Sequence, residues 1–546
     1  MSDTSGSRPS LRLIAGELLS TIAQDVDDVA EIALGGRPMG TDPGAEVPEP
    51  PESIARKPRI AVVGGGIAGL SAAWSLINDR GVDAEIVVFE SDSDVGGKLK
   101  LGQVDGITVD AGAESLLAIR PEAVALAKAV GLTASITHPA TTQASLLSGG
   151  SLHPLPPGLI SGVPTDLRAL AASDILSTPG LLRIPLDHLL PKTSIDVDVS
   201  IGDYVATRLG REVVDRLVEP MVGGVYAGRA EDLSLEMTMP ALFRLARRER
   251  SLLTAAREAR ATGAAPSGSR RGPIFAGITG GVGRLGPAVA DRLRRRGVRI
   301  ERDSTVTGVR RVGKGWRLIV NQAGEARREN VDAVVLAVPA PAAAKVLRQA
   351  NPLVASTLDT IDYASVALVT YVFNTAEVPP NVQGSGFLVP PVEGHAIKAA
   401  TYSSRKWTWV AKAGAGAKGS KRGRGKRPSR TVVRVSLGRY GEAEVLQRDN
   451  AELVALGARD LHAITGLPST PVASLVTRWG GALPQYTVGH RSRVAAIRER
   501  LIDTPGIAVC GAAYDGVGIA ACIGSAQFAA GQVAGYLLER GQWAHG

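Results

Sequence analysis

A glycine-rich turn near residue 64 holds the first residues whose types and spacing could do chemistry. Residues 59–74 read RIAVVGGGIAGLSAAW, an apolar run that leads directly into the turn residues Gly64, Gly65, Gly66, Ile67, Ala68 and Gly69. This order is typical of a buried strand that turns sharply into a helix. The backbone N–H groups at the start of such a helix can bind the pyrophosphate of a dinucleotide, because the helix dipole is positive there.

An acid at the end of the next predicted strand narrows the choice of dinucleotide. The strand EIVVFE ends at Glu90, about twenty residues beyond the last glycine of the turn. A carboxylate at this place accepts hydrogen bonds from a ribose 2′-hydroxyl and repels a 2′-phosphate. These residues therefore favour FAD or NAD over NADP, and by themselves they leave the choice between FAD and NAD open.

The elements that must position the turn lie in separate regions of the chain. A helix is expected over 68–79, a buried strand over 331–340, and a strand, a glycine loop and a long helix over 506–537. Residues 121–260 read as mostly helical, and several segments between 363 and 437 are rich in β-formers. The pattern predicts an α/β protein with a split Rossmann-type dinucleotide-binding domain, an α+β substrate-binding module and a helical subdomain.

Six segments follow from this division. The first is an N-terminal extension with one amphipathic helix and a linker, which is either a docking helix or a loosely attached tail. In chain order the segments are the extension 1–57, a first nucleotide-binding segment 58–118, the mostly helical substrate module 119–274, a second nucleotide-binding segment 275–345, a β-rich substrate segment 346–499 and a third nucleotide-binding segment 500–546.

The formal net charge of +9 raises the question of a nucleic-acid partner. Residues 411–430, AKAGAGAKGSKRGRGKRPSR, hold eight Lys or Arg and no acid, so the rest of the chain is nearly neutral. A nucleic-acid-binding face would spread its cations over the fold, whereas this Gly- and Ala-rich insert cannot bury a core. We predict a disordered surface loop and no nucleic-acid partner, with a site for another anionic partner as the alternative.

The cysteines and the hydropathy of the chain indicate where in the cell the protein is located. Cys510 and Cys522 are the only cysteines, which argues against a disulfide framework and favours two small core residues in a reducing cytoplasm. The polar start MSDTSGSRPS predicts no signal peptide. The uncharged run 516–538 is rich in glycine, which favours a buried helix over a membrane span. We expect a cytoplasmic protein without a transmembrane span; peripheral association with the membrane is the alternative.

Two further glycine loops and the C-terminal segment carry a family resemblance. ESDSDVGGKLK places Gly97 and Lys98 after Glu90, VDAGAES spans 109–115, and GAAYDGVGIAACIGSAQFAAGQVA follows near the C-terminus. Together with the first glycine turn they resemble the flavin-containing amine oxidase superfamily. The resemblance implies FAD. The cofactor is expected to be non-covalent, because neither Cys nor His stands in 511–518, where covalently flavinylated members attach the ring.

Longer stretches narrow the resemblance. RLVEPMVGGVYAGRAEDLSLEMTMPALF at 216–243, GITGGVGRLGPAVADRL at 277–293 and RWGGALPQYTVGH at 478–490 are similar to the protoporphyrinogen and coproporphyrinogen oxidases of haem biosynthesis. The similarity covers residues 59–540, and the soluble bacterial branch is the closer match. It implies removal of six electrons from a porphyrinogen, with dioxygen as acceptor and three H2O2 as products. Coproporphyrinogen III is the expected substrate, and protoporphyrinogen IX is the alternative.

The resemblance also assigns cofactor contacts and no catalytic side chain, because the flavin carries the chemistry. The implied cofactor-binding residues are Gly64, Gly65, Gly66, Ile67, Ala68, Gly69, Glu90, Ser91, Gly97, Lys98, Gly112, Ala113, Glu114, Ser115, Val306, Trp479, Ala512, Val517, Gly518 and Ile519. Lys98 stands where relatives often carry an aromatic residue or an arginine. Trp479 and Tyr486 are expected to wall the flavin or the tetrapyrrole, with ordinary aromatic core as the alternative. No metal site is expected.

Carboxylates of a porphyrinogen need fixed cations. Arg120 matches a position where the family places a substrate-facing cation, and Lys398 and Arg434 lie on predicted strands of the substrate module. With Tyr486 they form the expected substrate-binding set; for Arg120, a surface residue at a helix start is the alternative. The expected partners are the porphyrinogen and dioxygen, with transient contacts to other enzymes of haem synthesis. The competing hypotheses are another flavin oxidase, acting on an amine or a carotenoid, and a non-catalytic flavin-bearing scaffold.

Overall fold

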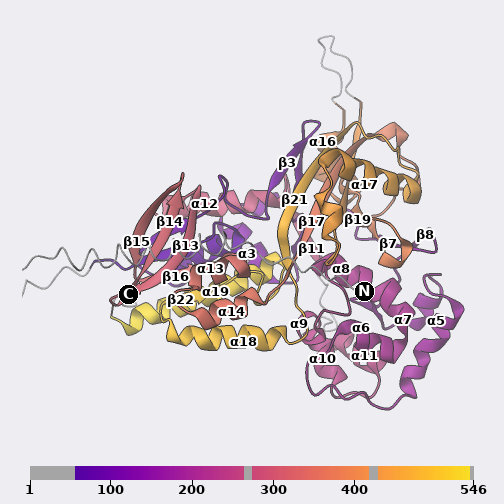
Figure 1. Cartoon of the computed structure of the whole chain (residues 1–546). Helices are drawn as coiled ribbons and strands as arrows, with labels where there is room; N and C mark the ends of the chain where they lie inside the picture. The colour runs from indigo at the N-terminus through magenta and orange to yellow at the C-terminus, as the bar shows by residue number, and fades with distance from the viewer. Residues whose placement is uncertain (1–55, 263–272, 417–427, 542–546) are drawn as a thin grey trace, which may run out of the picture. The chain divides into compact units, whose positions relative to one another are not determined.

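A computed structural model describes residues 56–262, 273–416 and 428–541 of the chain (Figure 1). The chain divides into two units, Met1–Arg56 and Lys57–Gly546. Every element given below lies in the second unit. The amphipathic helix predicted within the N-terminal extension falls outside the described residues, so that prediction stays untested.

A five-stranded parallel sheet joins distant segments of the chain. Its strands lie in the order β12, β2, β1, β16, β22, and every pairing is parallel. Their bounds are Arg299–Glu301 (β12), Glu85–Phe89 (β2), Arg59–Val63 (β1), Ala333–Leu336 (β16) and Ile507–Val509 (β22). Each of the three segments that the sequence assigned to the dinucleotide-binding domain therefore contributes at least one strand.

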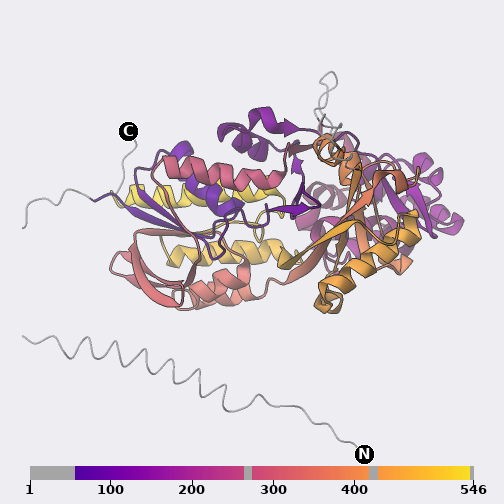
Figure 2. The same ribbon diagram turned by 90° about the horizontal axis from the view of Figure 1, so that it is seen from above.

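The apolar run of β1 is buried on both faces of this sheet. Ile60 and Val62 pack into one core, and Ala61 and Val63 pack into another. Because both faces are covered, the strand reads as a continuous apolar run and not as an alternating one. The helices of the first core are α2 (Ile67–Trp74), α3 (Pro121–Ala129), α12 (Leu285–Arg295) and α19 (Ile519–Glu539), and those of the second are α13 (Ala340–Leu347), α14 (Pro352–Asp359) and α18 (His490–Arg500). Figure 2 shows these helices on the two sides of the sheet.

Smaller sheets surround the parallel one. Three antiparallel strands, β13 to β15, lead into β16, and they contribute apolar residues to the second core. The bounds of the smaller strands are β13 Ser304–Val312, β14 Gly315–Gln322, β15 Glu325–Val331, β3 Leu101–Val104, β4 Ile107–Asp110, β5 Leu116–Leu117, β6 Ile136–Thr137, β11 Phe275–Ile278, β9 Leu159–Ile160 and β10 Val163–Pro164.

A seven-stranded sheet, in the order β21, β17, β20, β19, β18, β7, β8, forms the substrate module. One of its faces packs on α17 (Asn450–Thr465). The bounds are β21 Ala473–Pro484, β17 Tyr363–Asn374, β20 Arg430–Leu437, β19 Ile397–Thr401, β18 Gly386–Leu388, β7 Ala144–Ser148 and β8 Ser151–Pro154. β7 and β8 lie inside the segment that the sequence assigned to the mostly helical module. Their partner strand β18 is far away in sequence, so no local signal linked them to this sheet.

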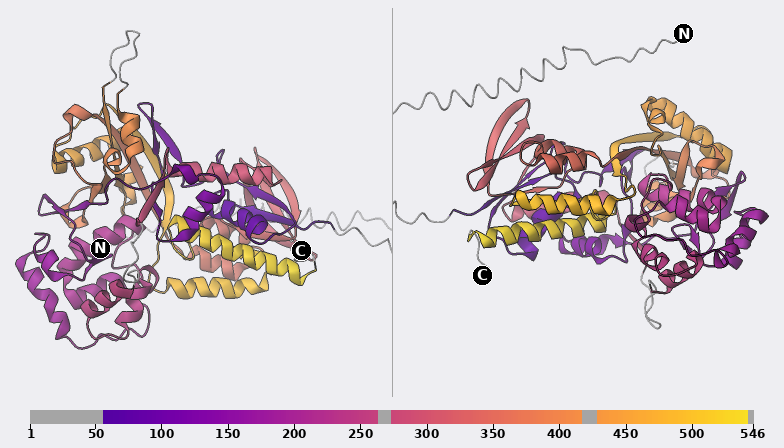
Figure 3. Two further views of the ribbon diagram at one scale, coloured as in Figure 1. Left: turned by 180° about the vertical axis from the view of Figure 1, so that it is seen from behind. Right: turned by 60° about the horizontal axis from the view of Figure 1, so that its bottom comes forward.

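The helical subdomain lies between β8 and β11 in sequence and has its own apolar core. Figure 3 shows it from two further directions. Its helices are α4 (Leu167–Ala171), α5 (Thr178–Arg183), α6 (Ile201–Leu209), α7 (Arg211–Val213), α8 (Glu219–Tyr226), α9 (Leu235–Thr238), α10 (Pro240–Ala246) and α11 (Leu252–Thr262).

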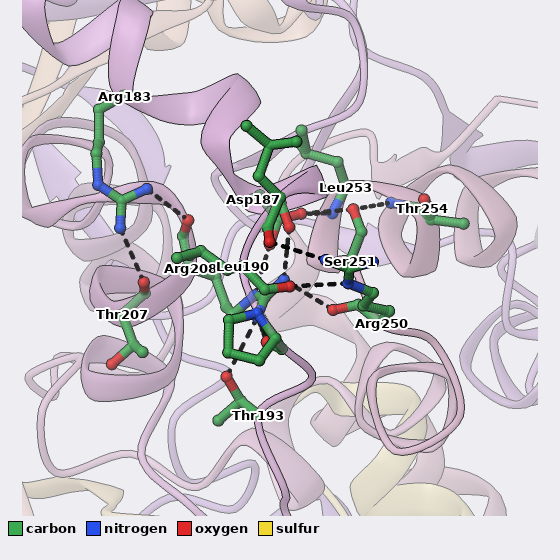
Figure 4. A network of polar contacts seen from close by, with 12 residues as sticks. Arg183, Asp187, Leu190, Thr193, Thr207, Arg208, Arg250, Ser251, Leu253 and Thr254 are labelled. Carbon is green, nitrogen blue, oxygen red and sulfur yellow. Dashed lines mark hydrogen bonds and ion pairs between the residues drawn. The ribbon is translucent and has the colours of Figure 1, made fainter.

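A buried ion pair fixes two loops of this subdomain (Figure 4). The carboxylate of Asp187 accepts the Nε–H of Arg208 at 2.5 Å, and both side chains are buried. The same carboxylate accepts the hydroxyl of Ser251 at 2.5 Å and the backbone N–H of Leu253 at 2.9 Å. Arg208 donates to the carbonyl oxygen of Pro191 at 2.6 Å. Removal of either charge would leave the other buried without a partner, which costs several kcal/mol, so the pair holds both loops against α6.

The basic insert differs from its prediction as a disordered loop over 411–430. Its first residues belong to α16 (Thr408–Gly414), in which Val410 and Gly414 are buried. These two residues anchor the helix, and the density of cations that follows hid this signal in the sequence. Residues 417–427 lie outside the described residues of the chain.

The C-terminal glycine-rich run forms α19, which packs against α2 and agrees with the prediction of a buried helix. Among the residues that the structure describes, no helix is both long and apolar enough to span a bilayer. Cys510 and Cys522 are buried and free, so the prediction of two core cysteines is confirmed.

Candidate active site

The glycine turn joins β1 to α2, and two of its glycines are required by the chain itself. Gly64 has a φ of +104°, in the left-handed region, and a Cβ there would lie 2.7 Å from the carbonyl oxygen of Ala337. A Cβ at Gly69 would lie 1.8 Å from the carbonyl oxygen of Gly64. Only glycine lets α2 pack this closely on the turn, so the strand, the turn and the helix form as the sequence predicts.

Gly66 has no such explanation within the chain. Its φ of −71° is open to any residue, and the nearest atom to a Cβ built there is the Cα of Gly97, at 4.0 Å. A side chain would instead fill the space before α2, which begins with Ile67 and Ala68 and has unpaired N–H groups in its first turn. Glycine at this position is what the close approach of a pyrophosphate requires. The turn therefore fits the diphosphate of a dinucleotide.

Glu90 follows the last residue of β2 and lies beside the turn. Its carboxylate accepts the N–H of Gly65 at 2.7 Å and the N–H of Asp92 at 2.8 Å. The hydroxyl of Ser91 donates to the same carboxylate at 3.2 Å. These bonds fix an acceptor-only group next to the turn, which fits a ribose hydroxyl and disfavours a 2′-phosphate.

The start of β13 runs beside Glu90. The N–H of Ser304 donates to the carbonyl oxygen of Glu90, and the N–H of Glu90 donates to the carbonyl oxygen of Glu301, both at 2.8 Å. Val306 follows at a bulge in β13 and is buried. The expected adenine contact therefore lies on the strand that adjoins the expected ribose contact.

Two further loops converge on the start of α2. Gly66 and Gly96 form a parallel β-bridge, and a Cβ at Gly97 would lie 3.3 Å from the Cα of Gly66. From the C-terminal region of the chain, a Cβ at Gly511 would lie 3.8 Å from the Cβ of Ala68. Glycine loops from distant regions of the sequence therefore meet at one helix N-terminus.

Residues 110–115 form a loop that lies against Lys98. The N–H of Ala113 donates to the carbonyl oxygen of Lys98 at 3.1 Å, and a Cβ at Gly112 would lie 2.0 Å from that oxygen. The surrounding protein desolvates the ammonium of Lys98 and lowers its pKa, while the nearby Cys522 of α19 acts in the opposite direction. The backbone of Lys98 therefore packs directly on this loop.

A buried ion network holds the 110–115 loop. The carboxylate of Glu114 pairs with Arg434 at 2.6 Å and with Lys406 at 2.9 Å, and it accepts the indole N–H of Trp407 at 3.0 Å. Lys406 also donates to the hydroxyl of Ser115 at 3.1 Å. Burial alone would raise the pKa of Glu114, but Arg434 and Lys406 outweigh it and lower the pKa to about 2. We call Glu114, Arg434, Lys406 and Trp407 the ionic clamp.

The ionic clamp gives Arg434, which the sequence predicted to bind a substrate carboxylate, partners within the protein. Besides its pairing with Glu114, the guanidinium donates to the carbonyl oxygens of Asp110 at 3.2 Å and Gly112 at 2.8 Å. Arg434 is therefore committed to the loop. Trp479 acts on the same loop, because its indole N–H donates to the carbonyl oxygen of Ala111 at 3.0 Å. Both side chains come from the seven-stranded sheet, and the sequence could not show that they point at a loop of the other domain.

The C-terminal loop 511–518 is held by uncharged donors. The phenol of Tyr486 donates to the carbonyl oxygen of Ala512 at 2.5 Å, and Nε2 of His490 donates to the carbonyl oxygen of Ala513 at 2.8 Å. The two rings stack with their centroids 4.3 Å apart. Burial lowers the pKa of His490 to about 4, so the ring is neutral at neutral pH. We call Tyr486 and His490 the neutral clamp.

The neutral clamp differs from the expectation that Tyr486 binds the substrate. Its side chain is 0% exposed and its hydroxyl is already bonded, so no face is left for a tetrapyrrole. Beyond the clamp, Gly518 caps α19 between Val517 and Ile519 with a φ of −73°, and no protein atom lies within 4 Å of a Cβ built there. Like Gly66, this glycine leaves room before a helix N-terminus, which suits a ligand that carries negative charge.

Two predicted substrate cations lie outside both clamps. Arg120 precedes α3 and pairs with Glu122 at 2.6 Å, with 44% of its side chain exposed. Lys398 lies at a bulge in β19 and is 8% exposed. Among the described residues its ammonium makes no hydrogen bond or ion pair. Burial and the charge of Arg439 lower the pKa of Lys398 to about 7.

Sequence reasoning missed several members of the two clamps. Trp407 lies 293 residues from Glu114 along the chain, and Lys406 is just as distant, so no local pattern links them to the loop. A signal for His490 did exist. It follows Tyr486 by one helical turn in PQYTVGH, a spacing that places two side chains on one side of a turn.

The sequence of this chain is similar to known flavin-dependent proteins over most of its length. A model of the family "Flavin containing amine oxidoreductase" matches residues 67–534. Coproporphyrinogen III oxidase of Mycobacterium leprae is 35% identical over 469 residues, which cover 85% of this chain and 96% of the relative. Coproporphyrinogen III oxidase of Bacillus subtilis is 28% identical over 488 residues, which cover 88% and 99%.

A solved structure is similar over most of its length. A chain from Exiguobacterium sp. 255-15 that bears the name protoporphyrinogen oxidase superposes with a TM-score of 0.74 at 29% identity, and the match covers 87% of this chain and 98% of that one. The region matched by the family model includes α2, the 110–115 loop, the 511–518 loop and both clamps. The chain therefore belongs to the flavin-containing amine oxidoreductase family.

Proposed function

We propose that this protein is an FAD-dependent oxidase that converts coproporphyrinogen III to coproporphyrin III. The observation that carries the proposal is the convergence of the glycine loops on the N-terminus of α2, with Gly66 open to a diphosphate. Membership in a flavin family supports it. So do relatives named coproporphyrinogen III oxidase that match nearly their whole length.

The residues around the loops divide the work of holding FAD. The turn at Gly66 takes the diphosphate, Glu90 takes the ribose and Val306 adjoins the adenine, so the chain has a place for each component of the adenosine half. The two clamps hold the loops at the flavin end. When bound, FAD supplies the hydride-accepting chemistry. Removal of six hydrogens from the porphyrinogen balances with reduction of three dioxygen molecules to three H2O2.

Lys398 is the residue we propose for a substrate carboxylate. Lys398 is mostly buried and is affected by the like charge of Arg439, so a carboxylate would supply an opposite charge there. Arg120 is a second candidate, because its side chain is partly exposed and its pairing with Glu122 can be exchanged for another carboxylate. Coproporphyrinogen carries two more carboxylates than protoporphyrinogen, so fixed cations favour it.

We also propose dioxygen as the acceptor and the cytoplasm as the location. Two buried free cysteines and the bacterial relatives support that location. Transient contact with other enzymes of haem synthesis would pass a poorly soluble porphyrin onward. The charge distribution of the chain supports no nucleic-acid partner.

The decisive experiment supplies each porphyrinogen to the purified flavoprotein. Under anaerobic conditions, coproporphyrinogen III should bleach the flavin absorbance, and admission of air should then give fluorescent coproporphyrin with three H2O2 per porphyrin. Gly66→Ala should fold like wild type, because the protein leaves room for the methyl group. It should purify with little flavin, because the methyl group would occupy the space that a bound diphosphate needs. Full flavin content in Gly66→Ala would place the cofactor elsewhere.

Protoporphyrinogen IX oxidation is the second candidate, favoured by the name of the Exiguobacterium structure. The Lys398→Met variant distinguishes the two candidates. The control is Lys345→Met, because Lys345 is an exposed lysine on α13. If the proposal holds, Lys398→Met lowers kcat/KM for coproporphyrinogen at least about tenfold, since one charge-assisted hydrogen bond is worth about 1.5–3 kcal/mol. A higher kcat/KM on protoporphyrinogen in the wild type would overturn the assignment.

A further inference from the structure

Tyr486 and His490 bond to two consecutive carbonyl groups of the 511–518 loop, and the protonation of each donor is fixed by its surroundings. Because the carbonyl of Ala513 can only accept, Nε2 of His490 must carry a hydrogen. Nη1 of Arg493 lies 3.4 Å from Nδ1, and a guanidinium can only donate, so Nδ1 is the acceptor. The ring is therefore neutral with one defined tautomer.

The backbone anchors this pair firmly. The N–H of Ser234 donates to the carbonyl oxygen of Tyr486 at 2.8 Å, and the N–H of Gln485 donates to that of Asp362 at 2.8 Å. His490 is the first residue of α18 and is 0% exposed. The donors cannot follow the loop if it moves, so they impose a direction on its peptide groups.

That direction leaves one donor without a partner. In a trans peptide the C=O of one residue and the N–H of the next point in opposite directions. The bond from Tyr486 to the carbonyl of Ala512 therefore turns the N–H of Ala513 away from the clamp. Ala513 is 2% exposed, and within the described residues its N–H makes no hydrogen bond. A buried backbone N–H without a partner is rare and unfavourable, which points to an acceptor that the chain does not supply.

We propose that Tyr486 and His490 act together as positioning residues that fix the direction of the Ala513 N–H toward the bound flavin. This inference rests on the flavin site of the proposed function. It gives the two side chains a role beyond filling the core, because they hold a donor that only the cofactor uses. A purely structural role would affect folding without affecting the flavin.

The test uses the purified full-length holoprotein and matched buried controls. Tyr486→Phe keeps the ring and its stacking on His490 but removes the hydrogen bond. Tyr371→Phe is the control, because Tyr371 is also 0% exposed and donates its hydroxyl to the carbonyl oxygen of Val454 at 2.8 Å, in the core under α17. The readouts are the dissociation constant of FAD, the flavin absorption spectrum and the flavin midpoint potential.

Tyr486→Phe should raise the dissociation constant of FAD about tenfold, equivalent to ~1.4 kcal/mol, and shift the flavin bands and the midpoint potential. Tyr371→Phe should lower the melting temperature to a similar extent and leave all three flavin readouts unchanged. An unchanged spectrum and potential in Tyr486→Phe would overturn the inference, as would equal shifts in both variants.

His490 provides a second route if Tyr486→Phe fails to fold. Gln keeps an N–H donor and Leu does not, so His490→Gln should stay closer to wild type than His490→Leu in all flavin readouts. His462, whose Nδ1 contacts the carbonyl oxygen of Leu467 at 2.8 Å, is the control. Equal effects of Gln and Leu would count against the clamp. If the wild-type protein itself purifies without any flavin, that result contradicts the proposed function and not this inference.

Discussion

The loop at 110–115 is held by a buried carboxylate with two cations, whereas the loop at 511–518 is held by a phenol and a neutral imidazole. Glu114 is ionised at any pH above about 2, and its partners approach from the seven-stranded sheet and from the end of the short helix α15 (Ser403–Lys406). His490 is neutral at any pH above about 4. Each clamp holds one of the two loops by side chains that are distant from it in sequence, but the two clamps use opposite kinds of donor.

The difference follows from what each loop adjoins. The 511–518 loop leads into the N-terminus of α19, where a long helix already supplies partial positive charge. Uncharged donors fix that loop without adding a full charge beside the helix N-terminus. The 110–115 loop has no helix N-terminus of its own, and there a buried ion pair gives a tight closure that resists opening. The molecule therefore uses charge where the loop must be closed and neutral hydrogen bonds where a peptide group must be aimed.

The largest effect is expected when the ionic clamp loses Arg434. Arg434→Met leaves Glu114 buried with Lys406 as its remaining cation, and loss of one partner of a buried pair costs about 3–5 kcal/mol. Denaturant unfolding should show that loss in the free energy of unfolding. The double variant Arg434→Met/Glu114→Gln should not recover that loss, because it leaves the ammonium of Lys406 without its carboxylate partner. An Arg434→Met protein as stable as wild type would show that the ion network does not close the loop.

The two clamps should also fail in different pH ranges. The pKa of His490 falls from 6.5 to about 4 on folding, so its contribution is complete above pH 6.5 and is lost as the pH falls toward 4. The pKa of Glu114 falls from 4.5 to about 2, so its contribution is lost only as the pH falls from 4.5 toward 2. Each pKa unit corresponds to about 1.4 kcal/mol, so each contribution is about 3 kcal/mol.

The pH ranges of the two clamps are measured as differences in the free energy of unfolding between wild type and a variant of each clamp. Asp110, whose pKa burial raises to about 6, changes stability in the opposite direction between pH 6 and 4. The charges of Arg493 and Asp198 also act on His490. The stability difference between wild type and His490→Gln should therefore shrink from pH 7 to pH 4, and that between wild type and Glu114→Gln should shrink only below pH 4.5. Identical profiles would remove the distinction between the clamps.

A smaller effect is expected from the second cation of the ionic clamp. Lys406→Met removes one charge-assisted hydrogen bond to Glu114 and one bond to Ser115, but Arg434 stays in place. We expect a loss of about 1.5–3 kcal/mol in the free energy of unfolding, less than for Arg434→Met. The measurement compares the free energies of unfolding of Lys406→Met and Arg434→Met. A larger loss in Lys406→Met would make Lys406 the main partner of the carboxylate.

The sequence could predict the glycine turn between β1 and α2 but not the clamps, for a physical reason. The apolar run, the glycines and Glu90 lie within some thirty residues, and each signals a local requirement of a strand, a turn or a ribose. Arg434 and Glu114 are separated by most of the substrate module, and their contact depends on the register of β20 in a sheet built from remote strands. Arg434 therefore looked like a substrate ligand, and Tyr486 looked like a cavity wall.

The smallest effect compares one neutral hydrogen bond on each loop. Trp479→Phe removes the bond to the carbonyl of Ala111, and a single neutral bond is worth about 0.5–1.5 kcal/mol. Trp316→Phe is the control, because its indole N–H donates to the carbonyl oxygen of Pro505 at 3.1 Å and its ring is 2% exposed. Both variants should lose similar stability. If the ionic clamp alone closes the 110–115 loop, Trp479→Phe should change the dissociation constant of FAD less than about threefold, against about tenfold for Tyr486→Phe. A change in Trp479→Phe as large as that in Tyr486→Phe would mean that both loops depend on neutral donors, and the contrast between the two clamps would then be lost.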